Sequence, residues 1–464
     1  MAPENNENPS FKNQRYMPPW REPYLIGIAG CSGSGKTSIA SAIIKQLNVP
    51  WTVLMSMDNF YKPLNDDQRK LAFDSKWDFD SPDSFDLDLL LEVLHDLKQG
   101  KKVQIPTYSF KDHNRTGKWI NIYGANVIIL EGIYALYDPR VLELMDIKIF
   151  VDTDFDICLA RRLHRDILHR GRELDLSIQQ WDKFVKPNFH KYVKGTMNNA
   201  DVLVPRGLDN VIAINMLSTQ IRRQLHKKSE QHMSDLLLLG SGRNGFDKNS
   251  IALLCQSPQV KAMHTILLDN SSTRDDFIFY FDRLAGLLIS RALDELTSYQ
   301  PKKVVTPGNL VVEGISLPYN DLCAITIIRG GECFNRALRT AVPTIRLGKI
   351  LIQSDATTGE PALHTLSLPP CISPTKPGDA DGTRRPVLLV DAQMSSGAAA
   401  TMATAILIDH GVREEDIMVI TYLASELALN RFTSAFPKTT VVVGKTHKEV
   451  LPRFIDARYF GTAD

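Results

Sequence analysis

Residues 24–38 read YLIGIAGCSGSGKTS, and this stretch decides the fold of the first half of the chain. Tyr24–Ala29 is a short apolar run that ends at a glycine, which predicts a buried parallel strand. Residues 30–37 match the pattern G-x-x-x-x-G-K-[ST], and residues 38–44 predict a helix. A strand, a glycine-rich turn and a helix form the context in which this pattern binds phosphate.

The chemistry of this loop predicts a nucleoside triphosphate site. Glycines let the backbone approach a phosphate, and the turn aims backbone N–H groups and the helix N-terminus at the anion. Lys36 adds a positive charge for the β- and γ-phosphates, and the Thr37 hydroxyl is a hard oxygen suited to Mg²⁺. The full motif in its context disfavours the alternative, an ordinary turn rich in glycine and serine. The expected nucleotide contacts are Gly30, Cys31, Ser32, Gly33, Ser34, Gly35, Lys36, Thr37 and Ser38.

The composition bounds the class of protein. At 464 residues the chain is too long for one ordinary core, so we expect two domains. A net charge of +1, with 43% hydrophobic and 23% charged residues, indicates a globular protein with no nucleic-acid and no membrane partner. Six scattered cysteines without a C-x-x-C pair fit a reducing compartment and argue against a zinc site. Because we find no signal peptide and no apolar run of about 18 residues, we expect a cytoplasmic protein.

From Tyr24 onward, short apolar runs alternate with amphipathic segments, which predicts a parallel sheet with helices on both faces. Ligands of such sheets bind outside the carboxyl ends of the strands. The expected strands are Tyr24–Ala29, Trp51–Met57, Val127–Leu130, Ile147–Val151 and Val202–Val204. The expected helices are Lys36–Leu47, Phe85–Leu97, Phe155–Leu168 and Ile178–Tyr192.

Changes in amino-acid composition along the chain predict the domain organisation. Residues 226–258 are rich in charge, serine and glycine, which predicts a linker between a first domain at 23–225 and a second at 259–464. Residues 1–22 predict a disordered tail, and residues 369–386, with five prolines, a flexible surface loop. The second domain is also expected to be α/β, with strands at Leu322–Ile328, Lys349–Gln353, Val387–Val390, Ile417–Leu423 and Thr440–Val443.

Two acidic residues follow strands of the first domain. Asp58 comes after the second strand, where a carboxylate can accept a proton from an attacking hydroxyl or hold a metal. A turn cap is the commoner use of an aspartate there. Glu131 follows four apolar residues, the usual place of an acid that reaches Mg²⁺ in phosphate-loop enzymes, although this pattern alone is weak.

Two other segments have the chemistry of a nucleoside site. Residues 77–83 and 106–115 combine aromatic rings with hydrogen-bonding groups, which suits a flat base, and a carboxylate can take two ribose hydroxyls at once. Residues 155–168 predict a helix with an apolar stripe and a basic side, followed by Arg170 and Arg172. This basic side is either a solvated face or a lid that closes arginines on phosphates.

In combination, these motifs resemble the uridine–cytidine kinases over about residues 23–225. The segments that carry the resemblance are GCSGSGKTS, MDNFY, WDFDSPDSFD, PTYSFKDHNR, ILEGI, DICLARRLHRD, RGR, FVKP and VPRGLDN, in this order. The resemblance implies ATP or GTP as the donor, with Mg²⁺, and uridine and cytidine as substrates. It implies metal contacts from Thr37, Glu131 and Asp58, and catalytic roles for Asp58, Lys36, Arg165 and Arg170. It implies substrate binding by Asp80, Arg162, Tyr108, His113, Tyr61, Phe79, Phe110, Arg172 and Gln180, and a place near the nucleotide for Asp209.

The second domain carries a weaker phosphate loop. Residues 387–399 read VLLVDAQMSSGAA, a strand, an acid and a small-residue turn that can wrap a 5-phosphate or bind nothing. With IIRGG, RLGKILIQSD and the ending RYFGT, the domain resembles a uracil phosphoribosyltransferase. Arg329 is kept, but Ser354 and Leu268 stand where that family has arginines, and the uracil loop near residues 451–458 is shortened. Each lost charge-assisted bond costs about 1.5–3 kcal/mol, so we expect a silent domain with a structural or regulatory role.

The first prediction is therefore a kinase that transfers the γ-phosphate to the 5′-hydroxyl of uridine or cytidine, for pyrimidine salvage. A second interpretation is a bifunctional enzyme that also makes UMP from uracil, favoured by Arg329 and Asp391. A third is a non-catalytic nucleotide-sensing scaffold, which Asp58 and Glu131 oppose. The resemblance also implies a homo-oligomer.

Overall fold

The computed structural model describes residues 16–241, 246, 248–297, 299–317, 322–355, 359–372 and 386–462. The chain divides into two compact units. One comprises Pro19–Ser229, and the other comprises Glu230–Asp464 together with Met1–Pro18. Each unit has its own sheet and its own hydrophobic core.

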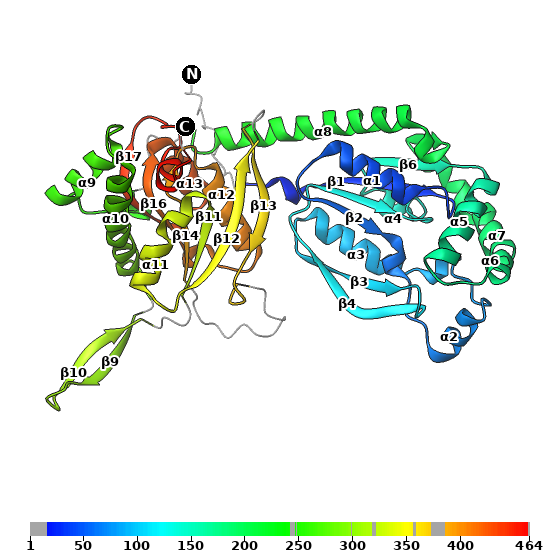
Figure 1. The fold of residues 1–464 in the computed structure, drawn as a ribbon, viewed down its shortest axis with the longest axis horizontal. Coiled ribbons are helices and arrows are strands. Elements are labelled where there is room, and N and C mark those ends of the chain that lie inside the picture. The colour runs from blue at the N-terminus through cyan, green and yellow to red at the C-terminus, as the bar shows by residue number, and fades with distance from the viewer. Residues whose placement is uncertain are drawn as a thin grey trace, which may run out of the picture. The chain divides into compact units, whose positions relative to one another are not determined.

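The unit at Pro19–Ser229, coloured from blue to green in Figure 1, is built on a parallel sheet. Its strand order is β2-β5-β1-β6-β7. Every neighbouring pair in it is parallel, which confirms the predicted parallel sheet. The central strand β1 is buried at all seven positions, as its apolar sequence requires. The strands are β1 Tyr24–Gly30, β2 Thr52–Ser56, β5 Val127–Glu131, β6 Ile147–Asp152 and β7 Val202–Pro205.

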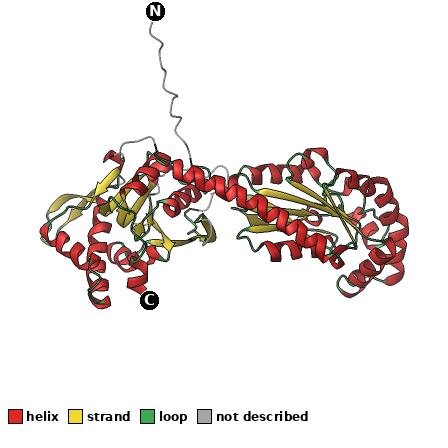
Figure 2. Cartoon of the chain, turned by 90° about the horizontal axis from the view of Figure 1, so that it is seen from above, coloured by secondary structure: helices red, strands yellow, loops and turns green. Residues whose placement is uncertain are grey.

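Helices cover both faces of this sheet (Figure 2). Alternate residues of β1 point to opposite faces: Leu25 belongs to one hydrophobic cluster, and Ile26 and Ile28 belong to the other. The helix after the phosphate loop, α1, buries Ile39, Ala40, Ile43 and Leu47, which recur at helical spacing. The helices of this unit are α1 Lys36–Leu47, α2 Asp66–Phe73, α3 Leu87–Lys98, α4 Pro139–Leu142, α5 Phe155–Leu168, α6 Leu174–Gln180, α7 Lys186–Asn188 and α8 Val211–Leu238.

Two segments of this unit differ from the sequence prediction. The aromatic-polar stretch is an antiparallel hairpin, β3 Val103–Ser109 and β4 Asn114–Ile122. The helix expected at 178–192 is interrupted by π-helical turns at Trp181–Val185 and Phe189–Val193, with α7 between them. Pro187 has no backbone N–H to donate within that stretch, which disfavours a regular helix there.

The other unit has a sheet with the order β13-β12-β11-β14-β16-β17-β8, and β15 (Gln393–Met394) pairs with β16. Among the strands in this sheet order, only β13 runs antiparallel to its neighbour. The strands are β8 Ile251–Leu253, β11 Cys323–Ile328, β12 Arg346–Ser354, β13 Pro361–Ser367, β14 Val387–Val390, β16 Ile417–Ser425 and β17 Thr440–His447, with a separate hairpin of β9 Gln300–Val305 and β10 Val311–Ser316. The helices are α9 Pro258–Leu268, α10 Arg274–Asp294, α11 Asn335–Ala341, α12 Ala398–Asp409, α13 Glu426–Ala435 and α14 Ile455–Phe460.

Three segments are predicted to lack regular structure, and the outcome differs among them. Of the expected tail, residues 1–15 lie outside the described residues, whereas Tyr16 and Trp20 are buried, so the prediction does not hold at these two positions. Of the expected linker, residues 226–238 continue α8 and residues 251–253 form β8, because both segments bury apolar side chains such as Leu236 and Ala252. Of the proline-rich loop, residues 373–385 lie outside the described residues. Within the described part of the chain, no helix is long and apolar enough to cross a membrane.

Candidate functional site

A polar cavity lies at the carboxyl ends of strands of the Pro19–Ser229 unit. In-register parallel pairing places Ser56 of β2 and Ile28 of β1 beside Glu131, the last residue of β5. The phosphate loop and Asp58 therefore follow strands whose ends lie beside this acid. The cavity is lined by Ser32, Lys36, Thr37, Asp58, Tyr61, Phe79, Asp80, Tyr108, Phe110, His113, Glu131, Gly132, Ile133, Arg162, Arg165, Arg170, Arg172 and Gln180.

The phosphate loop has a backbone that only glycine fits well. Gly33 has φ +87°, and a Cβ there would lie 2.3 Å from the carbonyl oxygen of Cys158. Gly35 is left-handed at φ 95° and directly precedes α1, so the first N–H groups of this helix are free to face an anion. The Lys36 ammonium is buried and donates to the carbonyl of Cys31 at 2.8 Å. This arrangement fits a triphosphate.

Three oxygen-bearing side chains beside Lys36 fit Mg²⁺. Thr37, Asp58 and Glu131 all line the cavity. Burial raises the pKa of Glu131, while Lys36 and hydrogen bonds from Ser56 and Thr37 oppose that shift, so this carboxylate lies in a site where a cation is favourable. The described residues hold no group of three or more acidic, histidine or cysteine side chains that would form an all-protein metal cage. Mg²⁺ is instead usually bound by one or two carboxylates together with phosphates of the substrate. Asp58 and Glu131 can provide the two carboxylates.

A buried polar group lies beside the loop. Asp80 is 7% exposed, and its Oδ1 lies 3.6 Å from Nη1 of Arg162. Burial raises the pKa of Asp80, and Arg162 lowers it by less. Arg162 also donates to Ser32 Oγ at 3.0 Å and to Gln180 Oε1 at 3.2 Å. Residues of the phosphate loop and α6 therefore position Arg162 of α5 beside the Asp80 carboxylate. A carboxylate in such a place can accept hydrogen bonds from two vicinal hydroxyls.

Aromatic rings form the next wall of the cavity. The rings of Tyr61 and Tyr108 have centroids 5.0 Å apart, and Phe79 meets Tyr61 edge-on at 5.8 Å. Phe110 lies beside Tyr108 at 5.3 Å, and the guanidinium of Arg170 covers its ring at 3.6 Å. Such a set of rings suits a flat heterocycle.

His113 closes this wall from the hairpin turn between β3 and β4. The turn is held by Ser109 Oγ, which donates to Asp112 Oδ2 at 2.6 Å, and His113 takes a left-handed φ of 50°. Its ring stacks on Phe79 with centroids 5.3 Å apart. Burial lowers the pKa of His113 to about 4, and Arg172 and Arg170 add to the shift. The ring is therefore neutral near pH 7 and can both donate and accept a hydrogen bond.

Four arginines of the cavity gather around one carboxylate, Asp166 of α5. Its oxygens lie within 3.0–3.6 Å of guanidinium nitrogens. Burial alone would raise the pKa of Asp166, but the arginines together hold it below its usual value. Burial disfavours the charged guanidinium of Arg170, and the positive charge of Arg165 repels it. Together they lower the pKa of Arg170 to about 10. The arginines concerned are Arg162, Arg165, Arg170 and Arg172.

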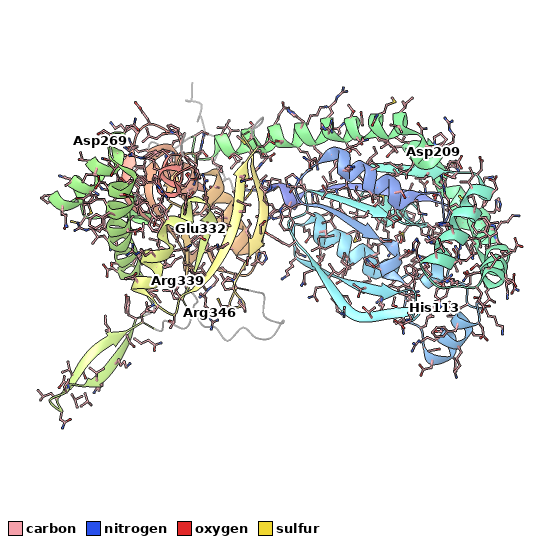
Figure 3. All side chains as sticks on the ribbon, viewed as in Figure 1. His113, Asp209, Asp269, Glu332, Arg339 and Arg346 are labelled. Carbon is pink, nitrogen blue, oxygen red and sulfur yellow. The ribbon has the colours of Figure 1, made fainter. Side chains whose placement is uncertain are left out.

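Most of the predicted site residues come together, and a few do not line the cavity. Gly30, Cys31, Gly33, Ser34, Gly35 and Ser38 belong to the phosphate loop and the start of α1 but are not among the lining side chains. Asp209 is 77% exposed and pairs with Arg161 at 3.6 Å. Figure 3 shows Asp209 and His113 at different edges of this unit. Asp209 is not among the residues that line the cavity, and its place near the nucleotide stays a prediction.

Three residues around the cavity make contacts that were not predicted from the sequence. Asp166 ends the DICLARRLHRD segment, and an acid directly after Arg165 could have indicated an arginine–carboxylate pair. Arg115 donates to the carbonyl of Tyr61 at 2.9 Å and pairs with Asp86 at 3.1 Å, which fixes the Tyr61 backbone. Asn188 donates to both oxygens of Asp78 at 2.9 and 2.8 Å, and no local pattern indicates that long-range pair.

The weaker phosphate loop of the other unit has a different electrostatic state. Asp391 directly follows β14 and is fully buried, and two nitrogens of Arg453 donate to it at 2.7 and 3.3 Å. Asp391 holds the pKa of Arg453 above its usual range. Arg329 pairs with Asp456 at 3.1 Å, so its charge is also engaged within the unit. Ser354 is exposed and Leu268 half-buried, and neither provides a cation.

Comparison with known proteins gives two family matches. The family described as Phosphoribulokinase / Uridine kinase matches residues 25–213, and Uracil phosphoribosyltransferase matches residues 254–461. The chain is similar to a Saccharomyces cerevisiae protein named uridine kinase, at 47% identity over 97% of this chain and 91% of that protein. It is 42% identical to uridine-cytidine kinase-like 1 of Mus musculus, over 96% of this chain and 82% of that protein. It is 41% identical to the uridine kinase of Schizosaccharomyces pombe, over 93% and 92% of the two chains.

Proposed function

The chain belongs to the phosphoribulokinase/uridine kinase family, with a uracil phosphoribosyltransferase domain in its second half, and we propose that it transfers the γ-phosphate of ATP or GTP to the 5′-hydroxyl of uridine and cytidine. One observation carries the proposal. A phosphate loop, two acids, a buried carboxylate beside an arginine and a set of aromatic rings line a single cavity. These are a donor half and a nucleoside half within reach of each other.

The proposed reaction assigns a role to each of these groups. Asp58 accepts the proton of the 5′-hydroxyl as that oxygen attacks the γ-phosphorus in line, and the bond to the β-phosphate oxygen breaks. Lys36 and the arginines around Asp166 neutralise charge that develops on the transferred group and on the leaving diphosphate. Asp80 and Arg162 take the ribose hydroxyls, and Tyr108 and His113 take the edge of the pyrimidine. Thr37, Glu131 and Asp58 would hold Mg²⁺, which neutralises phosphate charge when bound.

A nucleoside panel tests this proposal directly. The purified chain, with Mg²⁺ and ATP or GTP, is given uridine, cytidine, thymidine, adenosine or guanosine, and nucleotide products are separated by chromatography. We expect UMP and CMP as the main products, because uridine and cytidine are the substrates of the proposed reaction. ATP binding without any UMP or CMP would favour a nucleotide-sensing scaffold instead.

The lowered pKa of His113 predicts how nucleoside binding depends on pH. Because the neutral ring is stable down to about pH 4, the dissociation constant of uridine is expected to change less than about threefold between pH 8 and pH 5.5. Binding that needs the neutral ring is lost only as pH falls through that lowered pKa. Isothermal titration calorimetry of the nucleotide-free protein measures this. A tenfold weakening between pH 7.5 and pH 5.5 would show that His113 is protonated in that range.

We further propose that the second domain does not transfer a phosphoribosyl group. The buried Asp391 is engaged by Arg453, and Arg329 is engaged by Asp456, so these charges are already paired within the chain. The two cations absent at Ser354 and Leu268 would each have stabilised a diphosphate by about 1.5–3 kcal/mol. The domain then has a structural or regulatory role.

Uracil conversion tests the second proposal separately. Wild type and the Lys36→Met variant are incubated with uracil and 5-phosphoribosyl diphosphate, and UMP is measured; the variant lacks the kinase lysine, so UMP from any nucleoside contaminant is suppressed. We expect no UMP above background from either protein. UMP formation by both proteins, abolished by Asp391→Asn, would show that the chain is bifunctional.

A further inference from the structure

Asp166 is a buried carboxylate shared by four arginines that lie around the cavity. It is 0% exposed, and Arg165 Nε donates to its Oδ1 at 3.0 Å. Arg170 Nη1 lies 3.4 Å from the same oxygen. Arg162 Nε and Arg172 Nη1 lie 3.4 and 3.6 Å from Oδ2, without hydrogen-bond geometry. Asp166 itself does not line the cavity, so it acts on the site through its arginines.

The local backbone brings these side chains together. Arg162 and Asp166 are one turn apart on α5, which places them on the same face of the helix. The helix ends at Leu168, and Gly171 takes a left-handed φ of 65° that reverses the chain. The N–H of Arg172 then donates to the Asp166 carbonyl at 3.0 Å, so Arg170 and Arg172 return over the carboxylate.

The arginines depend on Asp166 to different degrees. Arg162 also has Asp80 and Ser32 as partners, and Arg172 also donates to Gln180 at 2.8 Å. Arg170 stacks on Phe110, but within the described part of the chain Asp166 is the only carboxylate paired with Arg165 or Arg170. Without Asp166, like charges at this separation repel, and these two side chains would move away from one another.

We propose that Asp166 is a positioning residue for phosphoryl transfer: its carboxylate holds the guanidiniums of Arg165 and Arg170 at the cavity wall, where they meet the phosphates of the donor. Asp166 and Asp80 are two carboxylates against four guanidiniums, so the cluster keeps a net positive charge for the triphosphate. The inference rests on the proposed kinase function, because it assigns the arginines to its transition state.

The test compares Asp166→Asn with wild type in uridine phosphorylation. The amide keeps the shape of the side chain but removes its charge. We expect kcat to fall about 100-fold, since a shift of about 1 Å in a positioned group has that effect. The KM for uridine should change less than about threefold, because Arg162, which meets the ribose, also keeps Asp80 and Ser32 as partners. A residue that only supports the fold would instead lower the yield of folded protein and leave kcat per folded molecule unchanged.

Two further variants keep the result interpretable. Asp156→Asn on the same helix is exposed and is the matched control, with wild-type kcat expected. Asp166→Glu keeps the charge but displaces it by one methylene, and we expect a folded protein whose kcat is about tenfold lower. A folded Asp166→Asn protein with kcat within about threefold of wild type would contradict the proposal. If the asparagine variant does not fold, wild-type kcat and KM in Asp166→Glu would contradict it equally. Absence of uridine phosphorylation by wild type would instead refute the proposed kinase function.

Discussion

Asp58→Asn is expected to lower kcat for uridine by about 10²–10⁴-fold, the usual contribution of a positioned general base. Asp58 lies on the single helical turn at Met57–Phe60 that follows β2, and the Ser56 hydroxyl accepts its backbone N–H at 3.3 Å. Asparagine has the same shape, so it fits this turn but cannot accept the proton of the attacking hydroxyl. Binding of a non-hydrolysable ATP analogue should remain within about tenfold of wild type, since the phosphate loop is unchanged.

Steady-state kinetics and calorimetry on the same preparation separate these two effects. Asp66→Asn, an exposed acid at the start of α2, serves as the control and should keep wild-type kcat. A variant at position 58 that retains near-normal turnover would show that another group accepts the proton.

Lys36→Met is expected to lower kcat by about 10²–10³-fold and to weaken binding of the triphosphate. The Lys36 side chain is 8% exposed and aims its ammonium along the loop to the Cys31 carbonyl. In that buried position a cation stabilises the transferred charge more than it would in water, so loss of Lys36 is expected to raise the free energy of the transition state. Methionine fills a similar volume, which limits the change in packing.

The matched control is Lys45→Met, an exposed lysine on the same helix, α1. Both proteins are compared by kcat, by the KM for ATP and by thermal unfolding. Loss of turnover in the Lys45 variant, or its retention in the Lys36 variant, would contradict the assigned role of Lys36.

Much of the first unit could be predicted from the sequence, because its strongest signals are local. The apolar run at Tyr24, the glycines after it and the periodic helix at Lys36 specify strand, turn and helix without distant contacts. The same alternation placed Asp58 and Glu131 after strands, and parallel pairing then puts strand ends at one edge. Helix α5 was predicted at Phe155–Leu168 with its observed bounds, since its apolar stripe is clear.

Other elements could not be predicted, because their stabilisation is not local. The hairpin of β3 and β4 mixes polar and aromatic residues without a clean period, and its β4 strand is largely exposed, so burial leaves no pattern to find. The stretch at 178–192 reads as one helix, but Pro187 and tertiary packing divide it. Predicted disorder at Tyr16 and Trp20 was wrong because both rings are buried by partners far along the chain, such as His232 and Tyr123.

The sequence by itself determined the phosphate loop, the two α/β units and the residue types of the site, because strand alternation, helical periodicity and the glycine–lysine motif depend on neighbours in the chain. Only the tertiary structure decided which charges are paired. Asp166 gathers arginines because a left-handed Gly171 returns the chain, whereas Arg453 reaches Asp391 across 62 positions of sequence. The electrostatic state of each site depends on distances of a few ångströms between side chains, and spacing along the chain does not set these distances.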